Sequence, residues 1–251
     1  MISTSSCPQP LLPHVVWDWN GTLKDDLDDI VGATNAAVSA LGEPPVDRDA
    51  YLAQHCVPLT DFYARLLGRP LAGGEWALAE AAFVRSLAQR PVRLRDGARD
   101  LLVSLQERGY TQSLLSLLPH DRLLAETAEA GIDHVFLRIE GRHRDDAARG
   151  KRLRTHLRAL GRTASEVLVI GDSRADARAA REIGAPVVLV AGGLEPILAL
   201  HEDGAPVAMD LDEAVEQGLR RGVPTARNAC RSRTVPAAGS PTGRLRLRRS
   251  Q

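Results

Sequence analysis

Apolar residues in the first third of the chain recur every three or four positions, which is the spacing of one face of an α-helix. This spacing predicts four consecutive helices, over residues 27–41, 47–55, 60–67 and 75–89. Glycine and proline residues separate the helices, and nothing between about 26 and 90 alternates like a β-strand. We therefore expect a small helical module in this part of the chain.

Short apolar runs replace this spacing after Pro91, and segments with helical spacing lie between them. The runs predict strands over 111–116, 135–139, 167–170 and 187–190, and an earlier strand includes Val15 and Val16. The segments between them predict helices over 97–108, 120–130, 151–160 and 173–183, and a polar loop over 140–150. Such uniformly apolar runs are typical of a parallel sheet that helices cover on both faces. The predicted fold class is therefore α/β, with an inserted α-helical module.

The length of 251 residues has room for one α/β domain and a smaller inserted one. Hydrophobic residues make up 44% of the chain but aromatic residues only 4%, so aliphatic side chains must form most of the core. We expect four parts: a flexible N-terminus over 1–13, a core made of 14–25 and 91–221, a helical module over 26–90, and a disordered tail over 222–251.

Charge is distributed unevenly, although the formal net charge of the whole chain is zero. The segment from Arg220 onward holds nine arginines and no acidic residue. The remaining residues 1–219 therefore hold 23 basic and 32 acidic residues, a net charge of −9. This balance argues against nucleic-acid binding by the body of the protein, and it leaves the role of the Arg-rich tail open.

Other features of the composition favour a soluble cytoplasmic protein. The three cysteines have no metal-ligand spacing and are typical of free thiols in a reducing compartment. The N-terminal residues lack the apolar core of a signal peptide, and no apolar run reaches the roughly 18 residues of a membrane span. The seven histidines show no metal spacing either, and we expect them at the surface or in loops.

Asp18 stands directly after the first predicted strand, at the edge where open α/β sheets place their ligands. Gly21 follows it and allows a sharp turn without a Cβ clash. A carboxylate at this place can attack an electrophile, and the N–H groups of the turn can face an anion. The sequence thus indicates a nucleophilic or anion-binding site at Asp18.

Two further carboxylates, Asp172 and Asp176, stand where another apolar strand meets a helix. Asp172 comes directly after the strand, and Asp176 lies one helical turn later. Together with Asp18 they would form the oxygen-rich set that Mg²⁺ prefers. The alternative is that both residues only cap the helix, and the spacing alone does not decide between the two interpretations.

Four short motifs resemble, in order, those of the haloacid dehalogenase-like hydrolases. They are Asp18-x-Asn20-Gly21-Thr22-Leu23, Ser116, Lys151 and Gly171-Asp172-x-x-x-Asp176. Together they extend the resemblance over roughly residues 14–190. The spacing is similar to that of the phosphoglycolate-phosphatase-like subgroup, in which a helical cap follows the first motif.

The resemblance implies a Rossmann-like core, a mobile cap, a small phosphorylated substrate and phosphoryl transfer to an aspartate. It makes Asp18 the nucleophile, with Asn20 and Lys151 as the other catalytic positions. It implies that Mg²⁺ is held by Asp18, the backbone carbonyl of Asn20, Asp172 and Asp176. It further implies that the phosphoryl group is bound by Thr22, Ser116 and Lys151.

The chain departs from the family pattern at two places. Asn20 replaces the second aspartate of the phosphatase branch, and Arg152 replaces the proline that usually follows the lysine. Asn20 cannot donate or accept a catalytic proton, so a degenerate binding or regulatory protein is the alternative function. Ser113 is a second candidate for the role of Ser116, and Lys151 has the alternative of a solvated lysine at a helix start. Nothing in the sequence indicates the substrate or the oligomeric state.

Overall fold

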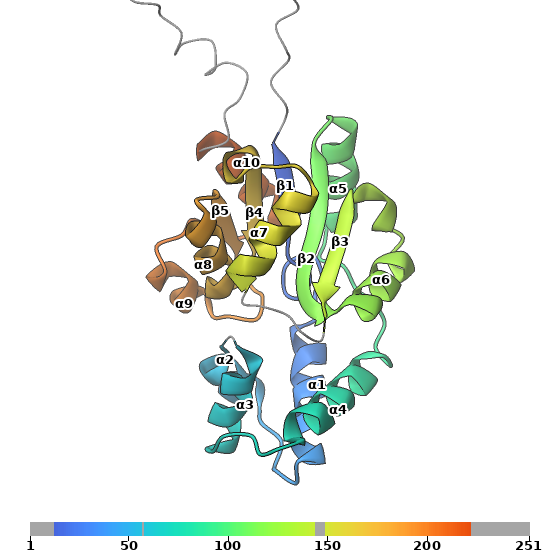
Figure 1. The fold of residues 1–251 in the computed structure, drawn as a ribbon, viewed down its shortest axis with the longest axis vertical. Helices are drawn as coiled ribbons and strands as arrows, with labels where there is room; N and C mark the ends of the chain where they lie inside the picture. The colour runs from blue at the N-terminus through green and yellow to red at the C-terminus, as the bar shows by residue number, and fades with distance from the viewer. Residues whose placement is uncertain (1–12, 57, 144–148, 222–251) are drawn as a thin grey trace, which may run out of the picture.

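The protein is built around a parallel β-sheet, seen in a computed structural model that describes residues 13–56, 58–143 and 149–221 (Figure 1). Within these residues the sheet has six strands in the order β3-β2-β1-β4-β5-β6. They are β1 (His14–Trp17), β2 (Thr111–Pro119), β3 (Arg138–Arg142), β4 (Val167–Gly171), β5 (Val187–Val190) and β6 (Val207–Ala208). All neighbouring strands run parallel, and the strand order reverses at β1. The reversal places the ligand-binding edge of the sheet at the carboxyl ends of β1 and its neighbours.

Helices cover both faces of this sheet because successive strand residues point to opposite sides. Leu168 and Ile170 of β4 belong to a core cluster that includes residues of α5 (Ala98–Glu107) and α10 (Leu211–Arg221). Val167 and Val169 belong to a second cluster, with residues of α7 (Arg149–Ala159) and α8 (Arg174–Ile183). The remaining core helices are α6 (His120–Glu129) and α9 (Ile197–Glu202). The predicted α/β fold class is confirmed.

Four helices between β1 and β2 lie together below the carboxyl edge of the sheet (Figure 1). They are α1 (Leu27–Ala40), α2 (Arg48–Gln54), α3 (Leu59–Leu67) and α4 (Glu75–Leu87). Two connecting segments join this four-helix group to the sheet, and they lie side by side. Asp25 N–H donates to the carbonyl of Arg93 at 3.0 Å, and Arg95 N–H donates to that of Leu23 at 2.9 Å.

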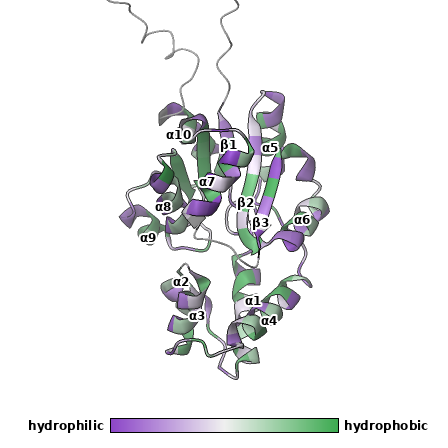
Figure 2. Ribbon diagram, in the orientation of Figure 1, coloured by the Kyte–Doolittle hydropathy of each residue, from purple (hydrophilic) through white to green (hydrophobic). Residues whose placement is uncertain are grey.

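Some predicted boundaries differ from the structure. The third helix begins at Leu59, with Pro58 rather than Thr60 at its N-cap. β3 covers Arg138–Arg142 instead of 135–139, so part of the predicted 140–150 loop is strand. β3 is an edge strand that carries hydrophilic residues, whereas β4 and β5 are hydrophobic along their length (Figure 2). A search for apolar runs locates buried central strands and misplaces an edge strand of this kind.

The predicted flexible N-terminus and Arg-rich tail fall mostly outside the described residues, which begin at Pro13 and end at Arg221. In the described part of the chain, no helix combines the length and the apolar character needed to cross a bilayer.

The expectation that the histidines lie at the surface or in loops is wrong for His14 in β1 and His156 in α7, which form a buried network. His14 contacts Thr111 Oγ1 at 2.8 Å and Ser113 Oγ at 2.7 Å. His156 contacts the same Ser113 Oγ at 2.8 Å and a Glu140 carboxylate oxygen at 3.0 Å. Both rings are fully buried. An imidazole can be buried in this way because each of its two nitrogens has a hydrogen-bond partner.

The His14 ring makes folding depend on pH. Burial, together with the nearby positive charge of Arg162, lowers the pKa of His14 from 6.5 to about 3. Below pH 6.5 the unfolded chain therefore binds a proton at His14 that the folded protein does not bind. Its contribution to stability is complete above pH 6.5 and is lost as the pH falls toward 3.

We expect His14→Gln to reduce the pH dependence of unfolding. Urea titrations at pH 6, 5 and 4 should give a wild-type free energy of unfolding that falls more steeply than that of the variant. The difference in slope should approach about 1.4 kcal/mol per pH unit, the value for one proton. Equal slopes for the two proteins would show that His14 titrates normally in the folded state.

Candidate active site

Asp18 and Asp172 meet at the carboxyl edge of the sheet because β1 and β4 are neighbours in parallel register. Trp17, the last residue of β1, pairs with Ile170 of β4. Asp18 N–H continues this pairing and donates to the Ile170 carbonyl at 2.9 Å. Asp172 follows Gly171, the last residue of β4. The two carboxylates are therefore brought together by strand pairing across more than half of the chain.

Asp176 completes a cluster of three carboxylates with Asp18 and Asp172. One carboxylate oxygen from each residue lies within 4.8 Å of the others, and all three residues are buried. Three buried negative charges so close together repel one another unless a cation or a proton compensates them. An all-oxygen donor set suits a hard divalent cation such as Mg²⁺. The cluster therefore fits the predicted metal.

Asp176 also takes part in a helix cap, so the two interpretations of its position are compatible. Ser173 is the N-cap of α8. Its backbone N–H donates to Asp176 Oδ2 at 3.2 Å, and its hydroxyl donates to the same oxygen at 2.6 Å. These bonds hold one side of the carboxylate and fix its orientation at the start of the helix.

Asp172 is held by two donors from other segments. Thr22 donates its hydroxyl to Asp172 Oδ1 at 3.3 Å, and Leu194 N–H donates to Oδ2 at 2.5 Å. Thr22 is fully buried and does not line the cavity described below. The Thr22 hydroxyl therefore orients a predicted metal ligand, and a role of Thr22 in substrate binding stays a prediction.

Glycines permit the close packing around these carboxylates. A Cβ atom on Gly21 would lie 2.1 Å from Asp172 Oδ2, and one on Gly193 would lie 2.2 Å from the same oxygen. A Cβ atom on Gly171 would lie 2.3 Å from Asp176 Cγ. Gly21 also has a φ of +72°, in the left-handed region. Side chains at these positions would push the carboxylates apart.

Asn20 lies in the turn after Asp18 and is bound to Asp26. Its amide nitrogen donates to Asp26 Oδ2 at 2.5 Å, while Gly21 N–H donates to Oδ1 at 3.0 Å. Asp26 is only 2% exposed, and burial raises its pKa from 3.8 to about 6. The Asn20 amide nitrogen is therefore directed to Asp26.

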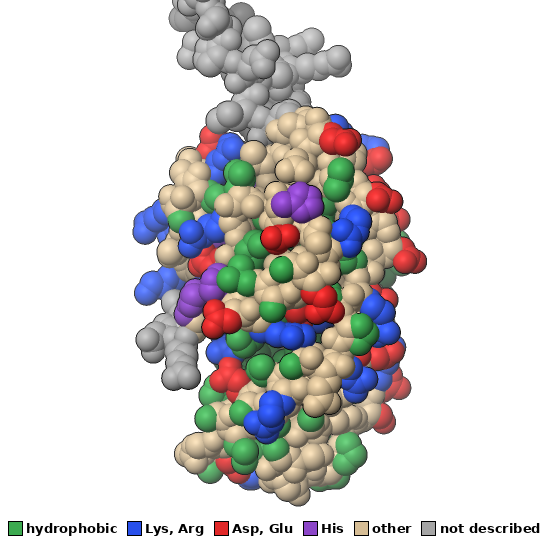
Figure 3. Space-filling model, turned by 90° about the vertical axis from the view of Figure 1, so that its right-hand side faces the viewer, with side chains coloured by type: hydrophobic (Ala, Val, Ile, Leu, Met, Phe, Trp, Pro, Cys, Tyr) green, Lys and Arg blue, Asp and Glu red, His purple; other side chains and the backbone are tan. Residues whose placement is uncertain are grey.

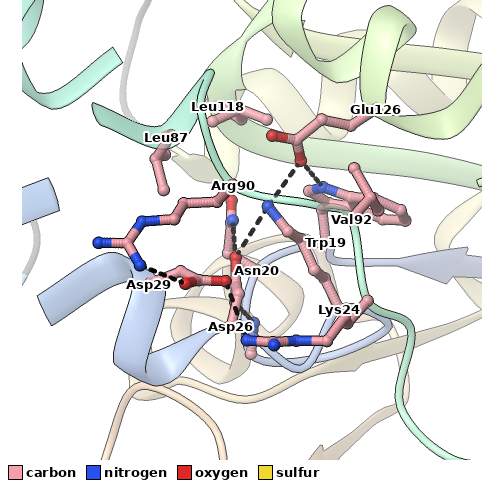
Figure 4. A network of polar contacts seen from close by, with 12 residues as sticks. Trp19, Asn20, Lys24, Asp26, Asp29, Leu87, Arg90, Val92, Leu118 and Glu126 are labelled. Atoms are coloured by element: carbon pink, nitrogen blue, oxygen red, sulfur yellow. Dashed lines mark hydrogen bonds and ion pairs between the residues drawn. The ribbon is translucent and has the colours of Figure 1, made fainter. Parts of the chain in front are cut away.

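A buried charge network anchors the same turn to α6 (Figure 4). Lys24 Nζ lies 2.9 Å from Glu126 Oε2 and 3.4 Å from Asp26 Oδ2. Trp19 donates its indole N–H to Glu126 Oε2 at 2.7 Å, and Arg122 donates to the other oxygen at 2.8 Å. Buried charges are tolerated when each has partners of this kind, and the partners restrict the turn to one conformation.

Of the two candidate serines, Ser116 is the one that reaches the site. It lines the cavity beside Asp18, and its Oγ accepts a hydrogen bond from Leu118 N–H at 3.1 Å. Ser113 is fully buried between His14 and His156 and does not line the cavity. The strand pairing is irregular between Leu115 and Pro119, and this irregularity coincides with the position of Ser116.

Lys151 is the predicted site residue that the structure does not bring to the others. It lies in the first turn of α7, its side chain is exposed, and it is not among the residues that line the cavity. Its neighbour Arg152 is buried and donates to the carbonyl of Ser116 at 2.8 Å. The contact of Lys151 with a phosphoryl group therefore stays a prediction.

A cavity that is open to solvent lies between the carboxyl edge of the sheet and the four-helix group. From the sheet side it is lined by Asp18, Asn20, Ser116, Asp172 and Ser173. Figure 3 shows a hollow across the middle of one face, with hydrophobic side chains inside it and Lys or Arg side chains beside it.

Comparison with known proteins agrees with this arrangement. A family model described as a haloacid dehalogenase-like hydrolase matches residues 12–184. A phosphoglycolate phosphatase of Pseudomonas savastanoi pv. phaseolicola is 26% identical over 243 residues, covering 92% of this chain and 85% of that protein.

Solved structures show the same fold. A crystal structure described as a predicted phosphatase from Clostridium acetobutylicum has a TM-score of 0.75 at 18% identity, covering 84% of this chain and all of that chain. A mutant of CbbY from Rhodobacter sphaeroides, in complex with xylulose-(1,5)bisphosphate, has a TM-score of 0.63 at 21% identity. That alignment covers 83% of this chain and 97% of that one.

We expect Gly21→Ala to damage both stability and the carboxylate cluster. The new Cβ would clash with Asp172, and the left-handed φ adds backbone strain of about 1–3 kcal/mol. Gly97→Ala is the matched control, since Gly97 has a φ of +74° and open space at its Cβ. Thermal unfolding should show a loss of stability in both variants, whereas Mg²⁺-dependent stabilisation should be lost only in Gly21→Ala. If both variants lose Mg²⁺ stabilisation, or if neither does, the close packing of Gly21 against Asp172 is not what keeps the carboxylate cluster able to bind the metal.

Proposed function

Because the chain belongs to the haloacid dehalogenase-like hydrolases, we propose that it is a phosphoric monoester hydrolase acting on a small phosphorylated metabolite. The observation that carries this proposal is the cluster of Asp18, Asp172 and Asp176 at the edge of the cavity between the sheet and the four-helix group. The relatives named phosphoglycolate phosphatases support the same reaction class. The proposed mechanism passes through a phosphorylated Asp18.

We assign the metal-binding role to the three carboxylates and to the backbone carbonyl of Asn20. A divalent cation such as Mg²⁺ would neutralise negative charge on the phosphoryl group when bound there. The cavity also offers the Ser116 hydroxyl as a donor to a phosphoryl oxygen. The backbone N–H groups of the turn after Asp18 would supplement this donor.

Asp18 supplies the nucleophile in the first half of the reaction. One of its carboxylate oxygens attacks phosphorus while the bond from phosphorus to the ester oxygen breaks, and the alkoxide leaves and takes a proton from solvent. In the second half, water attacks the phosphorus of the phosphoaspartate. The acyl-phosphate bond breaks, inorganic phosphate is released, and Asp18 returns to its starting state.

Asn20 limits the proton transfers that this reaction requires. Its side chain cannot protonate the departing alkoxide or deprotonate water, because an amide does not titrate in the required range. Esters with good leaving groups would therefore react faster than simple alkyl esters. The same substitution motivates a second candidate function, a catalytically inactive binding or regulatory protein that retains the carboxylate cluster.

The four-helix group would act as a cap over the site. It lines the cavity from the side opposite Asp18, and two adjacent segments join it to the sheet. We propose residues 26–90 as this cap domain and 14–25 with 91–221 as the hydrolase core. Movement about paired connections of this kind can admit a substrate and then exclude water.

Asp18→Asn is expected to abolish Mg²⁺-dependent hydrolysis of 4-nitrophenyl phosphate while leaving the melting temperature nearly unchanged, since the shape of the side chain is preserved. Lys151→Ala is the matched control. An exposed side chain outside the cavity should alter kcat/KM by less than about threefold. Retention of most activity by Asp18→Asn would contradict the mechanism, and a large loss in Lys151→Ala would restore the sequence-based role of that lysine.

Asn20→Asp is expected to raise turnover of alkyl phosphates more than that of aryl phosphates. A positioned acid or base contributes about 10²–10⁴-fold, and an alkoxide leaving group gains most from it. The new carboxylate would face Asp26, so the two groups would share a proton. The exchanged variant Asn20→Asp/Asp26→Asn removes this repulsion and serves as the control. If neither variant improves the alkyl ester, another group already transfers the proton.

A further inference from the structure

The part of the cavity that faces away from Asp18 is predominantly apolar. The four-helix group contributes several aliphatic and aromatic side chains to it: Ile30, Tyr51, Leu59, Phe62, Tyr63, Trp76, Phe83 and Val84. The sheet side adds the apolar residues Leu117, Leu118 and Leu194. When Asp18 attacks a phosphoryl group, the alcohol must leave away from the nucleophile, toward these side chains.

Aromatic rings form one connected wall of this region. Tyr51 packs edge-on against Phe62 at a centroid distance of 5.1 Å, and Phe62 contacts Tyr63 at 5.5 Å. Tyr63 in turn packs edge-on against Trp76 at 6.0 Å. Rings that support one another in this way are held rigid, and a rigid apolar wall favours a ligand with an apolar surface of similar size.

Among the described residues, the cavity offers no unpaired cation for a small anionic group. Arg142 is the lining arginine, and it forms an ion pair with Glu80 of α4. His55 also lines the cavity, but burial lowers its pKa to about 4, so it is neutral at physiological pH. A carboxylate in the leaving group would meet neutral, largely apolar surroundings and the negative charge of Glu80.

From this lining, and resting on the proposed phosphatase function, we infer the substrate class. The substrate is a phosphate monoester of an apolar, ring-bearing alcohol rather than a small anionic ester such as phosphoglycolate. The Glu80 and Arg142 pair joins the four-helix group to β3, and it is the feature that withholds a positive charge from the leaving group. This assignment distinguishes the chain from relatives that are named for phosphoglycolate.

The test compares 2-phenylethyl phosphate with ethyl phosphate and 2-phosphoglycolate, with Mg²⁺ present. The first two esters both release simple alkoxides, so a difference between them reports binding of the apolar group and not ease of departure. One methylene in an apolar pocket is worth about 10–200-fold in kcat/KM. We expect 2-phenylethyl phosphate to exceed ethyl phosphate and 2-phosphoglycolate by at least about tenfold.

Glu80→Gln provides a second readout, because it frees the charge of Arg142 without altering the apolar wall. The variant should raise the ratio of kcat/KM for 2-phosphoglycolate to kcat/KM for 2-phenylethyl phosphate several-fold, because a freed guanidinium can pair with the carboxylate of phosphoglycolate. Higher wild-type activity on 2-phosphoglycolate than on the phenylethyl ester would overturn the inference. Equal activity on the phenylethyl and ethyl esters would overturn it as well.

Failure of the inference and failure of the proposed function give different results. Turnover of 4-nitrophenyl phosphate with no preference for the phenylethyl ester would retain the phosphatase and reject the substrate class. Absence of turnover on every ester would reject the phosphatase. Titration calorimetry of wild-type protein with 2-phenylethyl and ethyl phosphate then tests whether the cavity prefers an apolar group. Tighter binding of the phenylethyl ester supports this preference, and equal binding rejects it.

Discussion

The parallel register of β1 and β4 is the constraint on which the site depends. It places Asp18 and Asp172 at adjacent strand ends, and Asp176 reaches the same point from the first turn of α8. Carboxylates so close in a buried place repel one another, and the surrounding structure must hold them there. Thr22 and Leu194 donate hydrogen bonds to Asp172, and Ser173 donates to Asp176. Glycines beside these carboxylates leave the space that they occupy.

The turn that follows Asp18 is held from the other side by buried charges. Lys24 links Asp26 to Glu126 of α6, and the indole of Trp19 donates to the same glutamate. Because these groups are buried, each relies on the others to replace lost hydration. The position of Asn20 is thereby tied to the core, so the replacement of an aspartate by asparagine changes proton chemistry at a fixed place.

Two parts of the chain line the site. The sheet contributes polar groups suited to phosphoryl transfer, and the four-helix group contributes a mainly apolar wall. The reaction class and the substrate preference can therefore vary separately, since they depend on different segments. An ion pair between Glu80 and Arg142 connects the two parts and leaves no unpaired lining cation in the described portion of the cavity.

The sequence by itself determined the fold class. Uniformly apolar runs indicate strands that are buried on both faces, and helical spacing indicates helices that are buried on one face. It also singled out the three acidic residues that the structure brings together and Ser116, which lines the cavity, since strand ends and short motifs are local features. It misplaced β3, an edge strand whose polar residues resemble a loop. Tertiary structure alone decided that Thr22 faces Asp172, that Lys151 is exposed, and that His14 and His156 are buried. These outcomes depend on contacts between distant segments, and no local pattern reports which segment will lie opposite a given side chain.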